Sequence, residues 1–551
     1  MFRENTSHRK VDTINDFTSM DKRLQRALME SWSPLFYDLV FSKIDETPLA
    51  PLYNSNTGRP NFPINIFLSL EFIKHMKNYT DEELLEQFRF NYQVMYAVGI
   101  RNIGESYFSV RTLYEFRERI YNYTKDHPEE EDLIFKQFNE LTYRFLKVAK
   151  IKTNEQRCDS TEIVPNIKKA GRLSLAFDVL INAVKAIPEE EVPDFIKLVL
   201  KAEFKTEILY KSKSNSKSRL ENLLELSYRL IEYINGRGEV ENLKEIQILK
   251  RFFNEQTTSG DGKTYFKVKE NKEILSSSLQ SAYDEDITYR KKAGKESSGY
   301  VLNLSETCSK ENPVQLITDY TLEKNIVTDI DMLIERLPVI IARTKLRDMY
   351  LDGGYYSERL EELCLELGVN LHYTSMTGRK INSSKLPLTS FNIENCQTVI
   401  SCPMGIAPIK SEYKKSKKLV VAEFDREKCC KCPLKDTCRV EIRKTKSIFR
   451  FAKKSIHAAE RRAKIESKEN RKQMVSKRAA IEGTNSSLKR SQGAGKLRVR
   501  GLIKSTLAIG MKIIGHNFKQ IIRFFRKTKQ TLQEITIPII KKQGMDLYFE
   551  V

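Results

Sequence analysis

The chain has 551 residues, of which 30% are charged, and a formal net charge of +21. This length exceeds what a single compact core usually organises, so we expect several domains. Hydrophobic residues make up 40% and aromatic residues 10% of the chain, which excludes an intrinsically disordered protein.

Export and membrane signals are not expected in this sequence. The start, MFRENTSHRKVDT, has no apolar core of the kind a secretory signal needs. No apolar run approaches the roughly 20 residues that span a bilayer. We therefore expect the nine cysteines to stay reduced. Five of them fall between Cys402 and Cys438, and such clustering favours metal binding over disulfide formation.

Residues 1–150 are predicted to be helical. Apolar residues recur at helical spacing from Ile64 to Lys77. Thr80 and Glu83 have the spacing of a capping box, and Ser109 is expected to cap a further helix. Such helices suit a helix-turn-helix-like DNA contact or, equally, a packing and dimerisation module.

The middle of the chain is predicted to be an α/β core with a helical insertion. Residues 151–170 contain a short strand that ends near Asp159, and residues 171–265 return to a helical pattern. Residues 266–395 mix the two types, which indicates an α/β fold. Their expected elements are strands at 299–305, 314–320 and 369–374 and helices through 330–337 and from Ser357.

A cysteine-rich segment follows at residues 396–440. Cys429 and Cys432 have the two-residue gap that lets one loop offer two thiolates to a tetrahedral Zn²⁺, and Cys402 and Cys438 complete four ligands. Four thiolates leave no open position, so this zinc would be structural. Cys430 and Cys396 are alternative ligands, and a metal-free loop with packed, reduced thiols is the other interpretation. The isolated cysteines are interpreted as core residues: Cys158, Cys308 and Cys364.

Residues 441–530 carry the charge of the whole chain. They hold 26 Lys and Arg against 5 Glu and no Asp, so this segment alone accounts for the net charge of +21. A concentrated basic segment is typical of a nucleic-acid-binding surface. The alternatives are a solvated basic surface or contact with an anionic membrane, but no clean lipid-facing stripe supports a membrane. Residues 531–551 form a tail too short to classify.

Glu482 is the acid that stands out in this basic segment. On a helix, Arg478, Glu482, Asn485 and Lys489 fall within a stripe of about 60°. One face then offers a carboxylate and an amide between two cations, which suits a metal ion held against a phosphodiester. The alternative is an ordinary i,i+4 pair between Arg478 and Glu482, whose order along the helix is the less favourable one.

Two further acids complete a candidate set of three. Asp159 is followed by Ser160-Thr161, so a turn or helix cap is enough to explain this acid by itself. Asp352 is followed by Gly353-Gly354, so a tight turn is enough to explain it. The rival acids nearby are Asp284, Asp286, Asp319 and Asp348. Mg²⁺ prefers carboxylate oxygens, and a pair of such ions can serve both the attacking and the leaving oxygen when DNA is cut. We find no nucleophile triad and no phosphate-binding Gly-rich loop that competes with this chemistry.

These motifs resemble those of bacterial insertion-sequence transposases with a DDE triad, closest to the group numbered eleven-eighty-two. The resemblance covers most of the chain, in order: Gly58-Arg-Pro60, Thr80-Asp-Glu-Glu-Leu84, Cys158-Asp-Ser-Thr161, Tyr283-Asp284-Glu-Asp286 to Gly299-Tyr300, and Leu351-Asp352-Gly-Gly-Tyr355. In related families the third acidic motif consists of Tyr, Arg, Glu and Lys at a fixed spacing. Here Val475, Arg478, Glu482 and Lys489 have that spacing, so only the Tyr is replaced.

The resemblance implies a ribonuclease H-like α/β core with a helical N-terminal domain, a helical insertion and a small zinc-ribbon-like insertion. It implies that Asp159, Asp352 and Glu482 bind Mg²⁺ (or Mn²⁺), and that the enzyme nicks terminal inverted repeats and joins the freed 3′-OH to target DNA. Double-stranded DNA, a homo-oligomer and a bacterial, nucleoid-associated cytoplasmic location follow by the same resemblance. The expected DNA contacts are Arg478, Asn485, Lys489, Arg490, Lys496, Arg498 and Arg500.

Two other functions fit part of this pattern. A non-catalytic, zinc-containing DNA-binding repressor would keep the basic helix and the cysteines without needing all three acids. A ribonuclease H-like nuclease would cut DNA without transferring strands.

Overall fold

A computed structural model describes residues 1–529 apart from residues 11, 56, 169, 211–214, 261–264, 293, 375–383, 454, 457–458 and 460–467. The expected tail at 531–551 therefore lies outside the described residues. The chain divides into two compact units: a larger one of residues 1–349, 363–369 and 481 onward, and a smaller one of residues 350–362 and 370–480.

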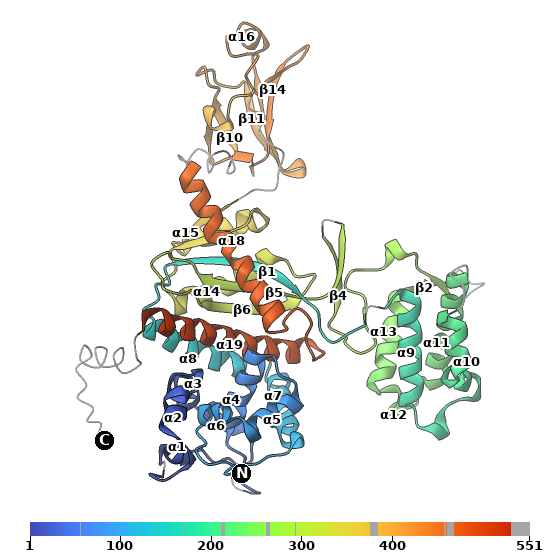
Figure 1. Ribbon diagram of the computed structural model, residues 1–551. Helices are drawn as coiled ribbons and strands as arrows, with labels where there is room; N and C mark the ends of the chain where they lie inside the picture. The colour runs from blue at the N-terminus through green and yellow to red at the C-terminus, as the bar shows by residue number, and fades with distance from the viewer. Residues whose placement is uncertain are drawn as a thin grey trace. The chain divides into compact units, whose positions relative to one another are not determined.

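The N-terminal part of the larger unit is helical, as the sequence predicts (Figure 1). Glu83 N donates to Thr80 Oγ1 at 3.1 Å and Thr80 N donates to Glu83 Oε2 at 2.7 Å, which confirms the capping box. Ser109 caps its helix as expected, by accepting from Thr112 N. The helices are α1 (Asp16–Ser19), α2 (Lys22–Met29), α3 (Trp32–Leu39), α4 (Ile64–Lys77), α5 (Asp81–Phe90), α6 (Tyr92–Ala97), α7 (Val110–Asp126) and α8 (Leu133–Val148).

The central sheet of the larger unit is built around β5 (Lys295–Thr307). β5 pairs antiparallel with β1 (Glu155–Ile163), with β4 (Thr288–Lys292) and with β6 (Ile317–Lys324). β7 (Asp348–Leu351) starts on the other side of β1, where Asp348 N donates to Asn154 O at 3.0 Å. β6 begins three residues after the predicted start at 314, because Gln315 Nε2 donates to Ser309 O and holds the preceding turn. α14 (Asp329–Arg343) packs on β5 and β6.

Helices α9 to α13 form a separate bundle that ends at Gln256, within the segment predicted to be helical at 171–265 (Figure 1). The apolar seam through Leu220, Leu223 and Leu224 lies in the bundle's own hydrophobic core. A short hairpin of β2 (Thr257–Ser259) and β3 (Phe266–Val268) follows the bundle. The helices are α9 (Arg172–Ala186), α10 (Ala202–Tyr210), α11 (Ser216–Ile234), α12 (Gly238–Glu241) and α13 (Lys244–Gln256).

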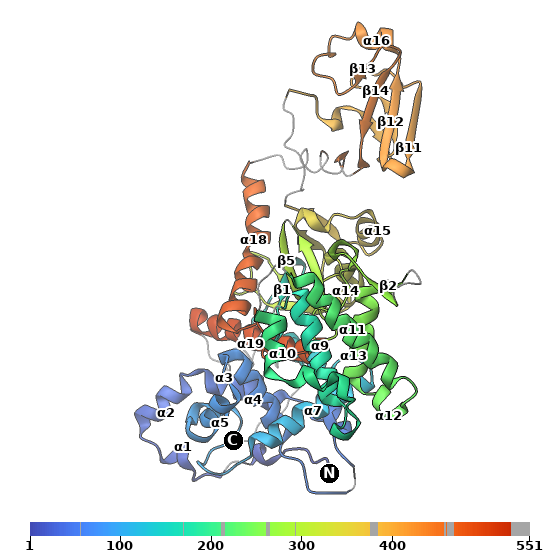
Figure 2. The same cartoon turned by 90° about the vertical axis from the view of Figure 1, so that its right-hand side faces the viewer.

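The long helix α19 (Leu502–Thr528) lies between the N-terminal helices and the sheet (Figures 1 and 2). It packs against α4, α8 and β6, and nearly every residue from Ser505 to Phe518 is buried. Asn517 joins three elements: its side chain accepts from Ile317 N at 2.9 Å, donates to Ile317 O at 2.8 Å, and donates to Thr142 on α8. Asp284 and Asp286 accept from the first amides of the helix, those of Gly501 and Leu502.

The smaller unit contains a four-stranded antiparallel sheet in the order β11-β12-β14-β13. Its core includes Val420, Ala422, Phe424 and Phe449, because alternate residues of β12 face inward. The sheet extends to Phe451, beyond the predicted boundary at 440, since β14 pairs along the whole of β12. The strands are β11 (Lys410–Lys414), β12 (Leu419–Phe424), β13 (Glu441–Ile442) and β14 (Ser447–Phe451), and a hairpin of β9 (Asn392–Glu394) and β10 (Thr398–Ser401) precedes them.

The chain passes between the units four times. The passages lie in β7, in α15 (Glu358–Glu366), just before Asn370, and in α18 (Lys468–Ser491). Within the smaller unit, Thr374 N, next to β8 (Asn370–Tyr373), donates to Leu351 O at the end of β7. Part of the basic helix predicted between Lys453 and Arg478 lies outside the described residues, and the described helix begins at Lys468.

Gly515 provides a test of the packing of α19. A Cβ at this position would lie 2.9 Å from Met76 Cα on α4, so Gly515→Ala forces the two helices apart. We expect Gly515→Ala to lower the melting temperature, with a cost of about 1–3 kcal/mol. Gly483→Ala on α18 is the matched control, because nothing lies within 4 Å of its added Cβ.

The control should raise the melting temperature slightly, since Ala favours a helix over Gly by about 1 kcal/mol. Differential scanning fluorimetry of both variants measures this difference. Equal shifts in the two variants would contradict the close approach of α19 to α4.

Candidate catalytic and nucleic-acid site

Helix α18 is anchored to the sheet of the larger unit by apolar and polar contacts. Ile481 and Leu488 are 0% and 1% exposed and belong to the main hydrophobic core. Thr484 Oγ1 donates to Glu306 Oε1 on β5 at 2.8 Å. Glu306 also accepts from Arg157 Nε on β1 at 2.7 Å. Because these contacts lie on successive turns, they fix both the position and the rotation of this end of α18.

Asp159 lies within β1 rather than after it and is 9% exposed. Asn485 Nδ2 on α18 donates to Asp159 Oδ2 at 3.3 Å. The Asn485 side chain is itself 7% exposed, and its Oδ1 accepts no hydrogen bond from the described residues. A buried amide oxygen beside a carboxylate is therefore open to a further donor or to a cation.

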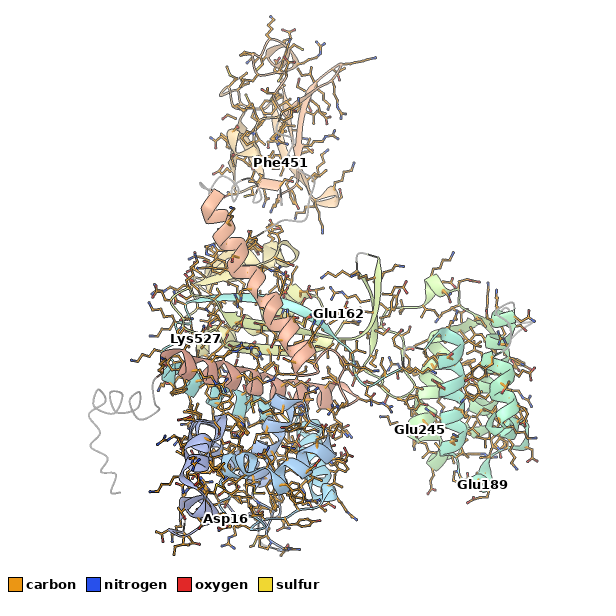
Figure 3. The ribbon with its side chains drawn as sticks, viewed as in Figure 1. Asp16, Glu162, Glu189, Glu245, Phe451 and Lys527 are labelled. Atoms are coloured by element: carbon orange, nitrogen blue, oxygen red, sulfur yellow. The ribbon has the colours of Figure 1, made fainter. Side chains whose placement is uncertain are left out.

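Lys489 lies near the same acid, one turn after Asn485. Burial lowers the pKa of Lys489, and the carboxylates of Glu162 and Asp159 oppose that shift. Glu162 lies near the end of β1 (Figure 3). Asn485 and Lys489, two residues of the predicted stripe on α18, thus both lie near Asp159, and their role in a metal or DNA site stays a prediction. Glu482 is exposed on the same helix, one turn before Asn485.

Asp352 belongs to the smaller unit and directly follows β7. Its Oδ1 accepts from Gly354 N at 2.6 Å, so the carboxylate caps the short turn that follows. A Cβ at Gly354 would lie 2.8 Å from that oxygen, which explains the glycine. Arg478 Nη2 lies 3.5 Å from Asp352 Oδ2. The sharing of one site by Asp352, Asp159 and Glu482 stays a prediction.

Three rival acids have structural partners. Asp284 accepts from Tyr300 OH at 2.8 Å and from Gly501 N at 2.7 Å, and Asp286 accepts from Leu502 N. Asp319 is buried in an ion pair with Arg336. These contacts hold α19 and α14 in place, and they account for acids that the sequence offered as alternatives.

The remaining predicted DNA contacts are exposed on or after α18. Arg490 and Lys496 are exposed. Arg498 Nη1 donates to Tyr79 O at 2.5 Å, and Arg500 Nε donates to Asn166 O at 2.8 Å. The last two side chains therefore hold the chain after α18 in place, and their role in DNA binding stays a prediction.

The predicted zinc ligands lie in the smaller unit. Cys429, Cys402 and Cys438 are partly buried against its hydrophobic core. Burial raises the pKa of the Cys429 thiol, and the thiols of Cys438, Cys402 and Cys432 shift it in the same direction. Cys396 lies in the turn of the β9–β10 hairpin at a φ of +53°. Cys158, Cys308 and Cys364 are buried, as predicted.

Among the described residues, no group of three or more His, Cys, Asp or Glu is arranged to hold a metal ion. The donor types nevertheless fit the metals that the sequence predicts: carboxylate and amide oxygens for Mg²⁺, and four neighbouring thiols for Zn²⁺. None of the described helices combines the length and the apolar character that a bilayer crossing requires.

Comparison with known proteins points to one class at two places in the chain. Residues 401–522 match the family model described as a transposase DDE domain, and residues 19–119 match the model described as a transposase domain (DUF772). No curated protein and no solved structure matches the chain. The two matches support a transposase as the class of this protein. The first range includes Glu482, while Asp159 and Asp352 lie outside both.

Sequence reasoning missed the residues that position the candidate acids. Glu306, Arg157 and Thr484 form a buried polar chain behind α18. Lys477 Nζ donates to Tyr350 OH at 3.3 Å in the smaller unit. The one available signal was Glu306 itself, a charged residue inside an otherwise apolar strand, because such a residue needs a buried partner.

Thr484→Val tests how α18 is anchored. The substitution keeps the side-chain shape but leaves Glu306 Oε1 without its hydroxyl donor, at a cost of about 1–3 kcal/mol. We expect a lower melting temperature and faster proteolysis of α18. Ser486→Ala, two residues further on, is the control and should leave both unchanged. Equal melting temperatures for the two variants would contradict the anchor.

Proposed function

We propose that this protein is a DDE transposase that binds the terminal inverted repeats of a mobile element, cuts DNA by metal-dependent hydrolysis and joins the 3′-OH ends to target DNA. Two transposase-domain matches support the class. The antiparallel strands β1, β5 and β6, with β7 starting on the other side of β1, are compatible with a ribonuclease H-like core.

The contacts of α18 carry this proposal. Asn485 contacts Asp159, Arg478 lies beside Asp352, and Glu482 is on the same helix between Arg478 and Asn485. One helix therefore carries an acid together with a contact partner of each of the other two acids.

Each residue of the site has a task in this reaction. Asp159, Asp352 and Glu482 would hold divalent ions, Mg²⁺ or Mn²⁺, which supply water activation and neutralise charge on the reacting phosphate. Asn485 orients Asp159 by its hydrogen bond. Lys489 and Arg478 carry positive charge next to Asp159 and Asp352, where a DNA phosphate would bind.

Substitution of the acids tests the proposal. The substrate is a plasmid that carries the DNA flanking the coding region as candidate element ends. We expect Asp159→Asn, Asp352→Asn and Glu482→Gln to bind these ends yet to cut them roughly 10²–10³-fold more slowly, because ion binding contributes several kcal/mol to the transition state. Glu232→Gln, an exposed acid on α11, is the control and should cut normally.

Product analysis separates the three functions. Wild-type protein with Mg²⁺ should give end-specific 3′-OH cuts and joined products, and a chelator should abolish both. Cutting without joining would identify a nuclease. End binding by wild-type protein that never cuts would identify a repressor and overturn the proposed activity.

We propose further that the smaller unit binds a structural zinc ion through Cys402, Cys429, Cys432 and Cys438. Cys402, Cys429 and Cys438 all pack against the hydrophobic core of this unit, which supports the site. Cys432 N donates to Cys429 O at 3.3 Å and Gly405 N donates to Cys402 O at 2.8 Å, so these three ligands lie in tight turns. Four thiolates would close the coordination shell and stabilise a unit with a small apolar core.

Metal analysis tests the zinc proposal. We expect about one zinc per chain in the purified protein and a clear loss of zinc and of thermal stability in Cys429→Ser. Cys430→Ser changes the adjacent thiol and should keep both. Loss of zinc from Cys430→Ser, but not from Cys429→Ser, would show that Cys430 is the ligand in place of Cys429. Wild-type protein that contains no zinc would refute the site.

A further inference from the structure

A cavity of about 390 Å³ lies in the larger unit, and none of the three candidate acids lines it. Its walls come from α4, α7, α19 and the segment between α18 and α19. Tyr79, Tyr114 and Tyr121 form part of the wall. The volume falls within the range that small ligands occupy in proteins.

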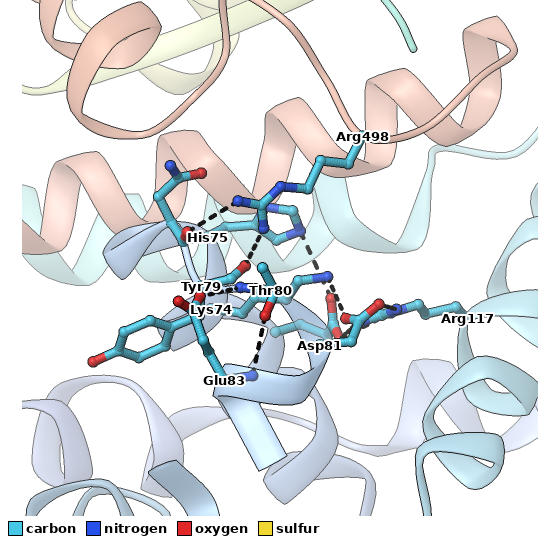
Figure 4. A network of polar contacts seen from close by, with 10 residues as sticks. Lys74, His75, Tyr79, Thr80, Asp81, Glu83, Arg117 and Arg498 are labelled. Atoms are coloured by element: carbon cyan, nitrogen blue, oxygen red, sulfur yellow. Dashed lines mark hydrogen bonds and ion pairs between the residues drawn. The ribbon is translucent and has the colours of Figure 1, made fainter. Parts of the chain in front are cut away.

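Glu71 and Glu118, which line this cavity, and the neighbouring Asp81 each have a cationic partner. Glu71, 1% exposed, accepts from Arg117 Nη2 at 2.6 Å. Asp81 lies 2.6 Å from Lys74 Nζ, and it also accepts from Arg117 (Figure 4). Glu118 pairs with Lys504 at 3.2 Å. The negative charge of the cavity is therefore already balanced.

Three further cations line the same cavity. Lys496, Arg498 and Lys512 have no carboxylate in ion-pair contact anywhere in the described part of the chain. Arg498 donates only to main-chain oxygens, those of Tyr79 and Asn78 (Figure 4). Lys512 is 5% exposed, and its Nζ donates to Gln492 O at 2.5 Å. The cavity thus has an excess of positive charge, part of it deeply buried.

The buried position of Lys512 is costly while its charge has no counter-ion. Burial, together with the positive charges of Arg498, Lys74 and Lys519, lowers the pKa of Lys512 to about 8. Burial and the neighbouring cations, Lys512 first among them, also lower the pKa of His75 well below 6.5. An anion in the cavity would relieve this repulsion by accepting from the lysine and the arginine.

We propose that this cavity binds a phosphate-type oxyanion between Lys496, Arg498 and Lys512. The group is either free phosphate or a phosphate on a nucleic-acid backbone, and both offer the same oxygens to the same three cations. Asp159, Asp352 and Glu482 do not line the cavity. Binding of free phosphate there does not depend on the proposed transposase activity, whereas binding of a DNA phosphate rests on it.

Inorganic phosphate is the first probe. At constant ionic strength, phosphate should raise the melting temperature of the full-length protein more than chloride does, since a ligand of the folded state stabilises it. Lys512→Met should weaken phosphate binding about tenfold or more, the loss expected for one charge-assisted hydrogen bond. Lys496→Gln removes an exposed cation of the cavity and should act in the same direction without disturbing the core.

Lys22→Gln is the matched control. Lys22 is exposed on α2 outside the cavity, and the substitution changes the net charge by the same amount. It should leave phosphate binding unchanged. Measurement at pH 7 and pH 9.5 adds a second criterion: wild-type affinity should fall as Lys512 loses its proton, while Lys512→Met should show little of this change. The charged or titratable groups around Lys512 are Lys74, His75, Glu71, Arg117, Arg498 and Lys519.

A DNA duplex is the second probe, read by fluorescence anisotropy. A tenfold loss of DNA affinity in Lys512→Met, but not in Lys22→Gln, would assign the cavity to a backbone phosphate. A loss of phosphate binding alone would assign it to free phosphate. If neither phosphate nor DNA binding distinguishes the cavity variants from the control, the proposal is wrong.

Discussion

The larger unit depends on the burial of α19 between helices and sheet. This helix is apolar around most of its circumference, so it must be covered on all sides. Asn517 sets its position, because the amide side chain completes the main-chain hydrogen bonds of Ile317 and also reaches α8. A buried amide with all these partners specifies one arrangement where apolar contacts alone would tolerate several.

The candidate site follows from that framework through the sheet and α18. β1 carries Asp159 in the interior of the sheet, and β5 supplies Glu306, which holds Thr484. The candidate catalytic acids are thus different residues from the acids that stabilise the fold, such as Asp284 at the start of α19. The basic residues also differ in their partners. Some donate to main-chain oxygens, some pair with carboxylates, and some line the cavity.

Local patterns predicted the helices well, and they predicted the capping box and the stripe on α18. These features depend on residues a few positions apart in the sequence, and helix geometry determines which of those side chains are in contact. The pairing of Thr484 with Glu306 and the cavity around Lys512 were not predictable, because each joins segments far apart in sequence. The start of β6 was misplaced for a local reason, the turn that Gln315 holds.

The late position of α19 in the sequence affects how the protein is made. Its partners α4 and α8 precede it by about 350 residues or more. During synthesis, α4 and α8 expose apolar surface until α19 has been made, because α19 is the element that covers them in the main hydrophobic core. Nascent chains of this protein should therefore be long-lived clients of ribosome-associated chaperones, and premature termination should yield insoluble fragments rather than a folded N-terminal domain.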